Sequence, residues 1–155
     1  MIQGDSSMYE NETVNVPWKA LLGAALGTIP GIFAWAGLGY LGVTWALVGL
    51  VIVFGAFWMY DKFGGESDNQ YGVIGVVILC ILAVYCGVHL SWSLQLYGAL
   101  KDEGDISLSN CITRLFPVLD YLDLKGKYVL AVLKGYLFAA LGAGGLIGRA
   151  LQGNQ

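Results

Sequence analysis

The feature that most constrains how this chain folds is a run of 41 consecutive residues, positions 20–60, that contains no charged side chain. A single α-helix of that length would reach about 60 Å, at about 1.5 Å per residue. The hydrocarbon core of a bilayer is only about 30 Å thick. The run therefore predicts two membrane-spanning helices, about 18–38 and 43–62, joined by a turn near the glycine-rich residues 37–42.

Two further spans are expected downstream. Positions 69–100 are again uncharged, and they predict a span at about 71–93 whose helix continues toward the headgroups. The apolar stretch 128–148 predicts the last span. Lys134 lies inside it but only about two turns from its start, so that its amine can reach the interface along the aliphatic stem.

The composition agrees with this pattern. Hydrophobic residues make up 57% of the chain and charged residues 12%, against about 25% charged residues in ordinary soluble domains. A chain so poor in charge could not cover its own surface in water, so the lipid bilayer is expected to surround much of it. The net charge of −3 argues against nucleic acid as a partner.

The sequence thus predicts an all-α, polytopic membrane protein with four transmembrane helices and one interfacial amphipathic helix. These elements are expected to form a single domain, residues 16–150. The polar, acidic residues 1–15 are expected to form a disordered tail, and residues 151–155 a second, short tail.

The amphipathic helix is predicted at 107–123. Apolar residues recur there at helical spacing, and Arg114 and Asp120 lie between them, as in helices that lie in the plane of the membrane interface. Pro117 is expected to bend this helix or to split it. The alternative for this segment is an ordinary loop packed on the bundle.

The stretch 20–31, ALLGAALGTIPG, is rich in glycine and alanine and allows two interpretations. A phosphate-binding loop needs a Lys followed by Ser or Thr, whereas Gly27 is followed here by Thr, Ile and Pro. The spacing instead favours a helix face of small residues, which lets a neighbouring helix approach closely in lipid. The predicted helix-packing residues on this face are Ala20, Gly23, Ala24, Gly27 and Gly31.

The last span carries glycines at similar intervals, Gly135, Gly142 and Gly145. They are expected to pack against the first span or against another copy of the chain. Two glycine-faced spans in so short a chain make a homo-oligomer, or a complex with a membrane-protein partner, the expected form. A channel built from such a small bundle would need several copies around one axis.

A few polar residues lie inside the predicted spans. Pro30 is expected to kink the first span and to free a backbone carbonyl, which the Thr28 hydroxyl could satisfy. His89 is the only histidine, and an ionisable side chain inside a span is a functional candidate because placing it there is costly. A structural hydrogen-bonding role is the alternative. The candidate polar membrane site comprises Thr28, Pro30, Tyr85, Cys86, His89 and Ser93.

No catalytic set can be assembled from this sequence. Cys80, Cys86 and Cys111 are scattered, and with a single histidine they do not match a metal-ligand pattern. Carboxylates lie at the predicted membrane boundaries rather than inside the spans, which argues against a proton-coupled pump. The sequence therefore predicts no enzyme, no metal and no cofactor. It leaves two functions open: a self-associating channel or transport component, or a non-transporting interaction or regulatory subunit of a larger membrane complex.

The glycine-rich transmembrane hairpin, with its GAALGTIPG helix, its LGY turn and a second helix ending in a glycine pair, resembles that of an uncharacterised family of small integral membrane proteins of Gram-positive (Firmicutes) bacteria. The LSW at Leu90–Trp92 and the GYL and LGA motifs within Gly135–Ala143 are also similar. The resemblance implies the bacterial plasma membrane with cytoplasmic termini, and it brings no activity. The basic residues of the loops mildly favour the opposite orientation under the positive-inside rule, so the orientation stays open.

Overall fold

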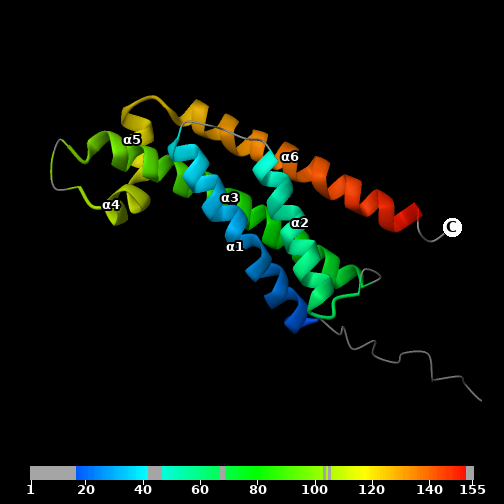
Figure 1. Cartoon of the computed structure of the whole chain (residues 1–155). Helices are drawn as coiled ribbons and strands as arrows, with labels where there is room; N and C mark the ends of the chain where they lie inside the picture. Colours follow the sequence, from blue (N-terminus) through cyan, green and yellow to red (C-terminus); the bar gives the residue numbers. More distant parts are fainter. Residues whose placement is uncertain (1–16, 42–46, 67–68, 103, 105, 153–155) are drawn as a thin grey trace, which may run out of the picture.

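The computed structural model describes residues 17–41, 47–66, 69–102, 104 and 106–152, and it describes 146–152 by their backbone alone. Within this part of the chain the secondary structure is helical, with no strand, so the predicted all-α class is confirmed (Figure 1). The predicted tail 1–15 lies outside the described residues, whereas the first two residues of the tail 151–155 belong to the last helix. The helices are α1 (Trp18–Tyr40), α2 (Leu47–Lys62), α3 (Gln70–Leu100), α4 (Leu108–Thr113), α5 (Leu115–Tyr121) and α6 (Lys125–Gln152).

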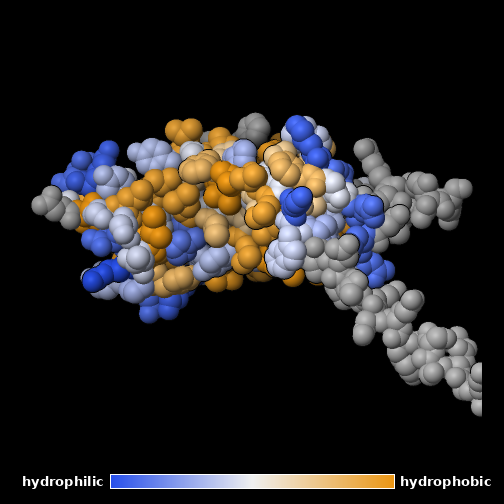
Figure 2. All heavy atoms as spheres, turned by 90° about the horizontal axis from the view of Figure 1, so that it is seen from below, coloured by the Kyte–Doolittle hydropathy of each residue, from blue (hydrophilic) through white to orange (hydrophobic). Residues whose placement is uncertain are grey.

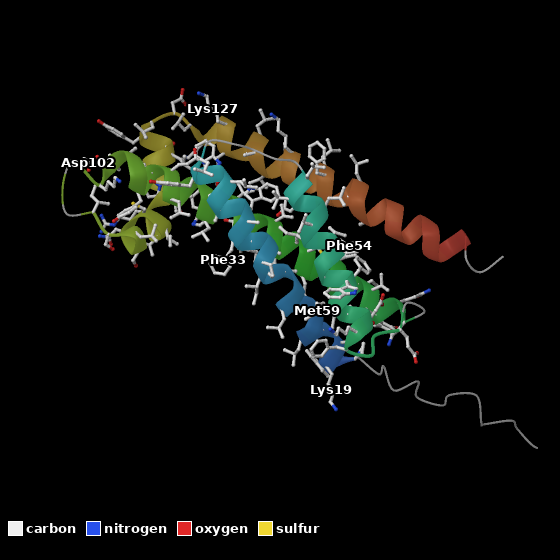
Figure 3. The ribbon with its side chains drawn as sticks, in the orientation of Figure 1. Lys19, Phe33, Phe54, Met59, Asp102 and Lys127 are labelled. Atoms are coloured by element: carbon white, nitrogen blue, oxygen red, sulfur yellow. The ribbon has the colours of Figure 1, made fainter. Side chains whose placement is uncertain are left out.

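The four longer helices lie alongside one another, and the two short ones lie at one end (Figure 1). α1 packs against α2 and α3, and α6 packs against the same two helices. α4 and α5 lie beside the last turns of α3, whereas α1 begins and α6 ends toward the opposite end (Figure 1). Figure 3 shows Lys19 at one end of the bundle and Asp102 and Lys127 at the other. Charged groups therefore lie at both ends of an elongated bundle.

Three of the described helices are long and apolar enough to cross a membrane: Trp18–Tyr40, Gln70–Leu100 and the Lys125–Gly145 part of α6. The structure therefore supports three of the four predicted spans. α2 covers the predicted span 43–62 only from Leu47 onward, because residues 43–46 lie outside the described part. Its 16 residues reach about 24 Å, short of the hydrocarbon core of about 30 Å.

The turn predicted near 37–42 does not begin at Gly37. α1 stays helical through Gly37 and Gly39 to Tyr40, and residues 42–46 lie outside the described part. Gly39 is buried, and a Cβ there would collide with the Ser91 hydroxyl of α3. This glycine therefore permits a close helix crossing, a role that the sequence pattern does not distinguish from a turn.

The side chains of α1 are distributed in the reverse of the order found in water-soluble helices. Its buried positions are mostly small residues such as Ala20 and Ala24, whereas Leu22 is 65% and Phe33 66% exposed. Figure 2 shows a belt of hydrophobic residues between two more hydrophilic ends. Such a belt would drive aggregation in water, but it matches the hydrocarbon core of a bilayer.

The small-residue face of α1 contacts α2 of the same chain. A Cβ on Gly27 would collide with the backbone carbonyl of Gly55, and a Cβ on Gly55 would lie 2.6 Å from the carbonyl oxygen of Gly27. The two backbones are therefore in direct, reciprocal contact. A Cβ on Gly23 would lie 2.6 Å from the Phe63 ring, and Gly31 lies against Ile52.

Trp35 is the residue on which the four long helices meet. A Cβ on Gly49 of α2, Gly87 of α3 or Gly135 of α6 would lie 3.5, 3.3 or 3.0 Å from an atom of the Trp35 side chain. One large ring thus fills the space left by three missing side chains. Close packing of this kind, with small residues opposite a large one, holds helices together where lipid supplies no hydrophobic driving force.

The predicted segment 107–123 forms α4 and α5, which separate at Arg114 and not at Pro117. Pro117 is the third residue of α5, where its missing N–H is tolerated. Its ring would clash with the carbonyl four residues earlier in a continuous helix, at Thr113, where α4 ends. The apolar side of the segment packs into the end of the bundle, since Leu115 and Leu119 are buried.

α2 and α5 end in the same backbone motif with different residues. At the end of α2, Gly64 has φ of 83° and Gly65 donates its N–H to the Tyr60 carbonyl at 2.9 Å. At the end of α5, Asp123 has φ of 54° and Leu124 donates to the Leu119 carbonyl at 2.9 Å. Both are left-handed helix terminations of the Schellman type, in which glycine is the favoured residue.

Candidate functional site

His89 lies on α3, where both of its ring nitrogens are within hydrogen-bonding distance of other elements. Nε2 is 3.0 Å from the backbone carbonyl oxygen of Ile112 on α4, and Nδ1 is 3.4 Å from the hydroxyl oxygen of Tyr128 on α6. A carbonyl oxygen only accepts, so Nε2 must carry the proton. In the neutral ring Nδ1 then accepts from the Tyr128 hydroxyl. The histidine therefore ties α3 to both of the later elements.

Aromatic rings surround the imidazole. Tyr85 stacks on it with ring centroids 6.0 Å apart, and Phe116 of α5 lies tilted at 5.7 Å. Tyr128 meets it edge-on at 6.4 Å, and the Tyr128 ring in turn contacts Trp92 at 5.9 Å. These separations are within the range in which aromatic pairs add stability beyond their buried area. The cluster brings α3, α5 and α6 together at the end of the bundle where α4 also lies.

The cavity beside His89 is shallow and has few reactive groups among its lining residues. It has a volume of about 400 Å³ and is lined by Ile32, Tyr85, Cys86, His89, Leu90 and Ile112. The Cys86 thiol and the imidazole thus share one cavity, but none of the lining residues is a carboxylate. Among the described residues no group of three or more His, Cys, Asp or Glu side chains could hold a metal ion. A thiol and an engaged imidazole alone complete neither a nucleophilic triad nor a metal site.

The remaining predicted polar residues do not join this cluster. Thr28 is buried, and its hydroxyl donates to the Ala25 carbonyl at 2.7 Å, in its own helix. The carbonyl that Pro30 deprives of a donor is that of Leu26, so Thr28 does not satisfy it as expected. Pro30 itself is exposed, and α1 stays helical through it. Ser93 is fully buried and donates to the His89 carbonyl at 2.8 Å, which makes it a local backbone bond of α3.

The sequence did not identify the partners of His89. Tyr128 lies at the start of the last predicted span and Phe116 within the predicted amphipathic segment, and nothing in the sequence connects either with the histidine. Both are aromatic residues at an expected membrane boundary, which is the one available signal. The Ile112 carbonyl gives no signal, since any residue supplies a backbone acceptor.

The helix-packing residues of the last span differ in what lies against them. Gly135 faces the bundle, against Val84 and Trp35, and Gly142 lies against Leu50 of α2. Gly145 has no atom within 4 Å of the position where a Cβ would stand. Only the first two of these glycines therefore contribute to packing within one chain.

The fold and its outward apolar belt define an all-α protein with three helices suited to a membrane, closed at one end by a histidine-centred aromatic cluster. No protein-family model and no solved structure matches the chain. Its function must therefore be inferred from its own geometry.

Proposed function

We propose that this chain is a multi-pass protein of the bacterial plasma membrane that self-associates through the outer face of α6, without catalytic activity. The observation that carries the proposal is how little of α6 the bundle covers. In the most apolar window of each span, 17% of the α6 residues are buried, compared with 28% in α1 and 33% in α3. α6 also carries Gly144 and Gly145, and among the described residues neither has an atom of another helix within 4 Å of a potential Cβ. Small residues on a lipid-facing helix let a second helix approach closely.

The glycines of α1 do not support this association. Gly27 and Gly31 are already in contact with Gly55 and Ile52 of the same chain. A second copy could reach them only by displacing α2. The free surface of α6 is therefore the better candidate for contact between copies.

In this proposal α2 makes the fourth crossing. It lies beside α1 and between the same two ends of the bundle (Figure 1). Its 16 described residues cover about 24 Å of a hydrocarbon core of about 30 Å. The α4–α5 segment then lies at the interface, with Phe116 and Tyr121 exposed there.

In this proposal, any transport path lies between copies of the chain. The described polar side chains that are buried in the bundle are Thr28, Ser91 and Ser93. Their hydrogen bonds run to groups of their own helices, so they do not mark a polar path across a single chain. A passage for ions or solutes would have to form around the axis of the oligomer.

The mass of the protein in mild detergent and in lipid nanodiscs tests the association. We expect the unmodified chain to be an oligomer and the Gly145→Leu variant to dissociate at protein concentrations at least tenfold higher. Gly37→Leu is the matched control, because Gly37 is also an exposed helical glycine without a neighbour within 4 Å, but it lies on α1. A monomeric parent protein, or equal effects of the two substitutions, would contradict the proposal. Flux measurements in liposomes with the same variants then test transport.

A second candidate function uses the same surface. The exposed leucines and glycines of α6 would accept a helix of another protein as readily as a second copy, which suits a regulatory or interaction subunit. Purification from native membranes distinguishes the two: a stoichiometric partner that is lost with Gly145→Leu supports the subunit, and a homogeneous homo-oligomer supports self-association.

A further inference from the structure

A groove on another side of the bundle combines an apolar floor with a cationic rim. It lies between α1, α3 and α6 and has a volume of about 750 Å³, within the roughly 300–1,000 Å³ that is usual for ligand sites. Its walls include the side chains of Trp35, Leu137 and Phe138. Lys127 and Lys134 of α6 also line it.

The two lysines direct their amines toward the same end. They are seven residues apart, which places them on one face of α6 and about 10 Å apart along its axis. Side chains of a helix tilt toward its N-terminus, so the Lys134 stem leads its amine toward the end where Lys127 and Asp102 lie (Figure 3). Within the described part of the chain, neither amine forms an ion pair with a carboxylate, since the ion pair found there joins Lys125 and Asp120.

The opposite wall of the groove, on α3, supplies hydrogen-bonding groups. Gln95 is exposed and donates from its amide to the hydroxyl of Ser91, 3.3 Å away. Gly39 makes room for that hydroxyl, because a Cβ in its place would collide with it. The head of the groove is therefore cationic on one side and uncharged but polar on the other, and none of the described residues that line it is a carboxylate.

From these observations we infer that the groove between α1, α3 and α6 binds the headgroup of an anionic phospholipid, with the acyl chains continuing along Leu137 and Phe138. The polarity of the groove follows the membrane normal. The amines lie toward the end of the bundle where Asp102 lies, and the aromatic and aliphatic walls lie deeper. Basic pockets between transmembrane helices suit anionic headgroups, and each amine near the membrane surface contributes to their attraction. Gly144 and Gly145, which are proposed for self-association, do not line this groove.

Quenching of tryptophan fluorescence by brominated lipids tests this inference, since Trp35 and Trp92 both line the groove. The full chain, with its other three tryptophans replaced by Phe, is reconstituted in phosphatidylcholine bilayers. Increasing fractions of brominated phosphatidylglycerol, or of brominated phosphatidylcholine as reference, are then added. We expect phosphatidylglycerol to bind at least fivefold more strongly than phosphatidylcholine. Each of Lys127→Gln and Lys134→Gln should reduce that preference about fivefold. The lowest value expected is equal binding of the two lipids.

Matched variants separate a specific groove from general surface charge. Lys62→Gln removes the same charge at the opposite end of the bundle and should leave the preference unchanged, whereas Lys134→Arg should retain it. The inference is overturned if the parent protein binds both lipids equally, if the double variant Lys127→Gln/Lys134→Gln keeps the preference, or if Lys62→Gln lowers it equally. Displacement of the brominated lipid by millimolar inorganic phosphate would assign the site to a free anion and would also overturn it. The oligomeric mass of these variants should stay unchanged, which keeps this test independent of self-association.

Discussion

The contact between α1 and α2 differs in kind from the contacts that hold α6. At Gly27 and Gly55 two backbones touch with no side chain between them. The closest contacts of α6 are instead with side chains, Trp35 against Gly135, Leu50 against Gly142 and Tyr128 near His89, whereas its backbone contact is looser: a Cβ on Gly49 of α2 would lie 3.3 Å from the Gly135 carbonyl oxygen. A side chain can change rotamer when a neighbour grows, whereas a helix backbone has no such freedom. The contact between α1 and α2 should therefore tolerate no added side-chain atom. The contacts of α6 should lose stability gradually as the added side chain grows.

The largest effect is expected for Gly27→Leu. The added side chain must push α1 away from α2, because the nearest atoms belong to the Gly55 backbone. We expect a loss of about 3 kcal/mol or more in the free energy of unfolding, at the upper end of overpacking costs. Denaturation in mixed micelles measures it. Leu26→Ala, at a position 52% exposed, is the control and should change stability by less than about 0.5 kcal/mol. Equal, mild effects would remove the distinction between the two kinds of contact.

A smaller loss is expected for Gly135→Leu, about 1–3 kcal/mol, because the neighbours of this glycine on α6 are the side chains of Val84 and Trp35. The same unfolding measurement applies. Gly145→Leu on the same helix should leave the unfolding free energy of the monomer undiminished, since nothing lies near it. If Gly135→Leu is as harmful as Gly27→Leu, the packing around Trp35 is as rigid as a backbone contact.

His89→Phe tests the attachment of α6 through hydrogen bonds. The ring volume is roughly kept, but the Tyr128 hydroxyl and the Ile112 carbonyl lose their partner. Leaving a buried polar group unpaired costs about 1–3 kcal/mol. Tyr128→Phe in the His89→Phe background should restore part of the loss, because it removes one unpaired group. No change in either variant would mean that water already satisfies these groups.

The smallest effects concern the two helix ends. Gly64→Ala at the end of α2 should destabilise the chain by about 1 kcal/mol, because alanine is strained at positive φ. Asp123→Gly at the end of α5 should stabilise it by up to about 1 kcal/mol, for the converse reason. Thermal unfolding of both variants checks the signs. A loss of stability in Asp123→Gly would show that the carboxylate has an interaction of its own that outweighs the backbone strain.

The membrane character of the fold could be predicted from the sequence, because it depends on local properties. Long apolar runs predict helices close to 18–38, 71–93 and 128–148, and the glycine spacing predicts a face that does pack against another helix. For the predicted span 43–62 the comparison covers only Leu47–Lys62, which are helical, because residues 43–46 lie outside the described part.

The candidate site was less predictable, because its contacts join distant parts of the chain. His89 stood out as the only histidine, but its partners lie on α4 and α6. The pattern of Gly37 and Gly39 pointed to a turn, whereas Gly39 faces Ser91 of another helix. Glycine breaks helices and also permits close approach, and only the tertiary structure decides which of these properties is used.

Trp35 also bears on the order in which the bundle is assembled. The residue leaves the ribosome with the first helix, before any of the three glycines that will surround it. Gly49, Gly87 and Gly135 follow one helix at a time, so its pocket gains a wall with each helix and closes only with the last. Until α6 has been inserted, the indole lacks one of its partners. A chain truncated before Gly135 would therefore present an incompletely packed tryptophan.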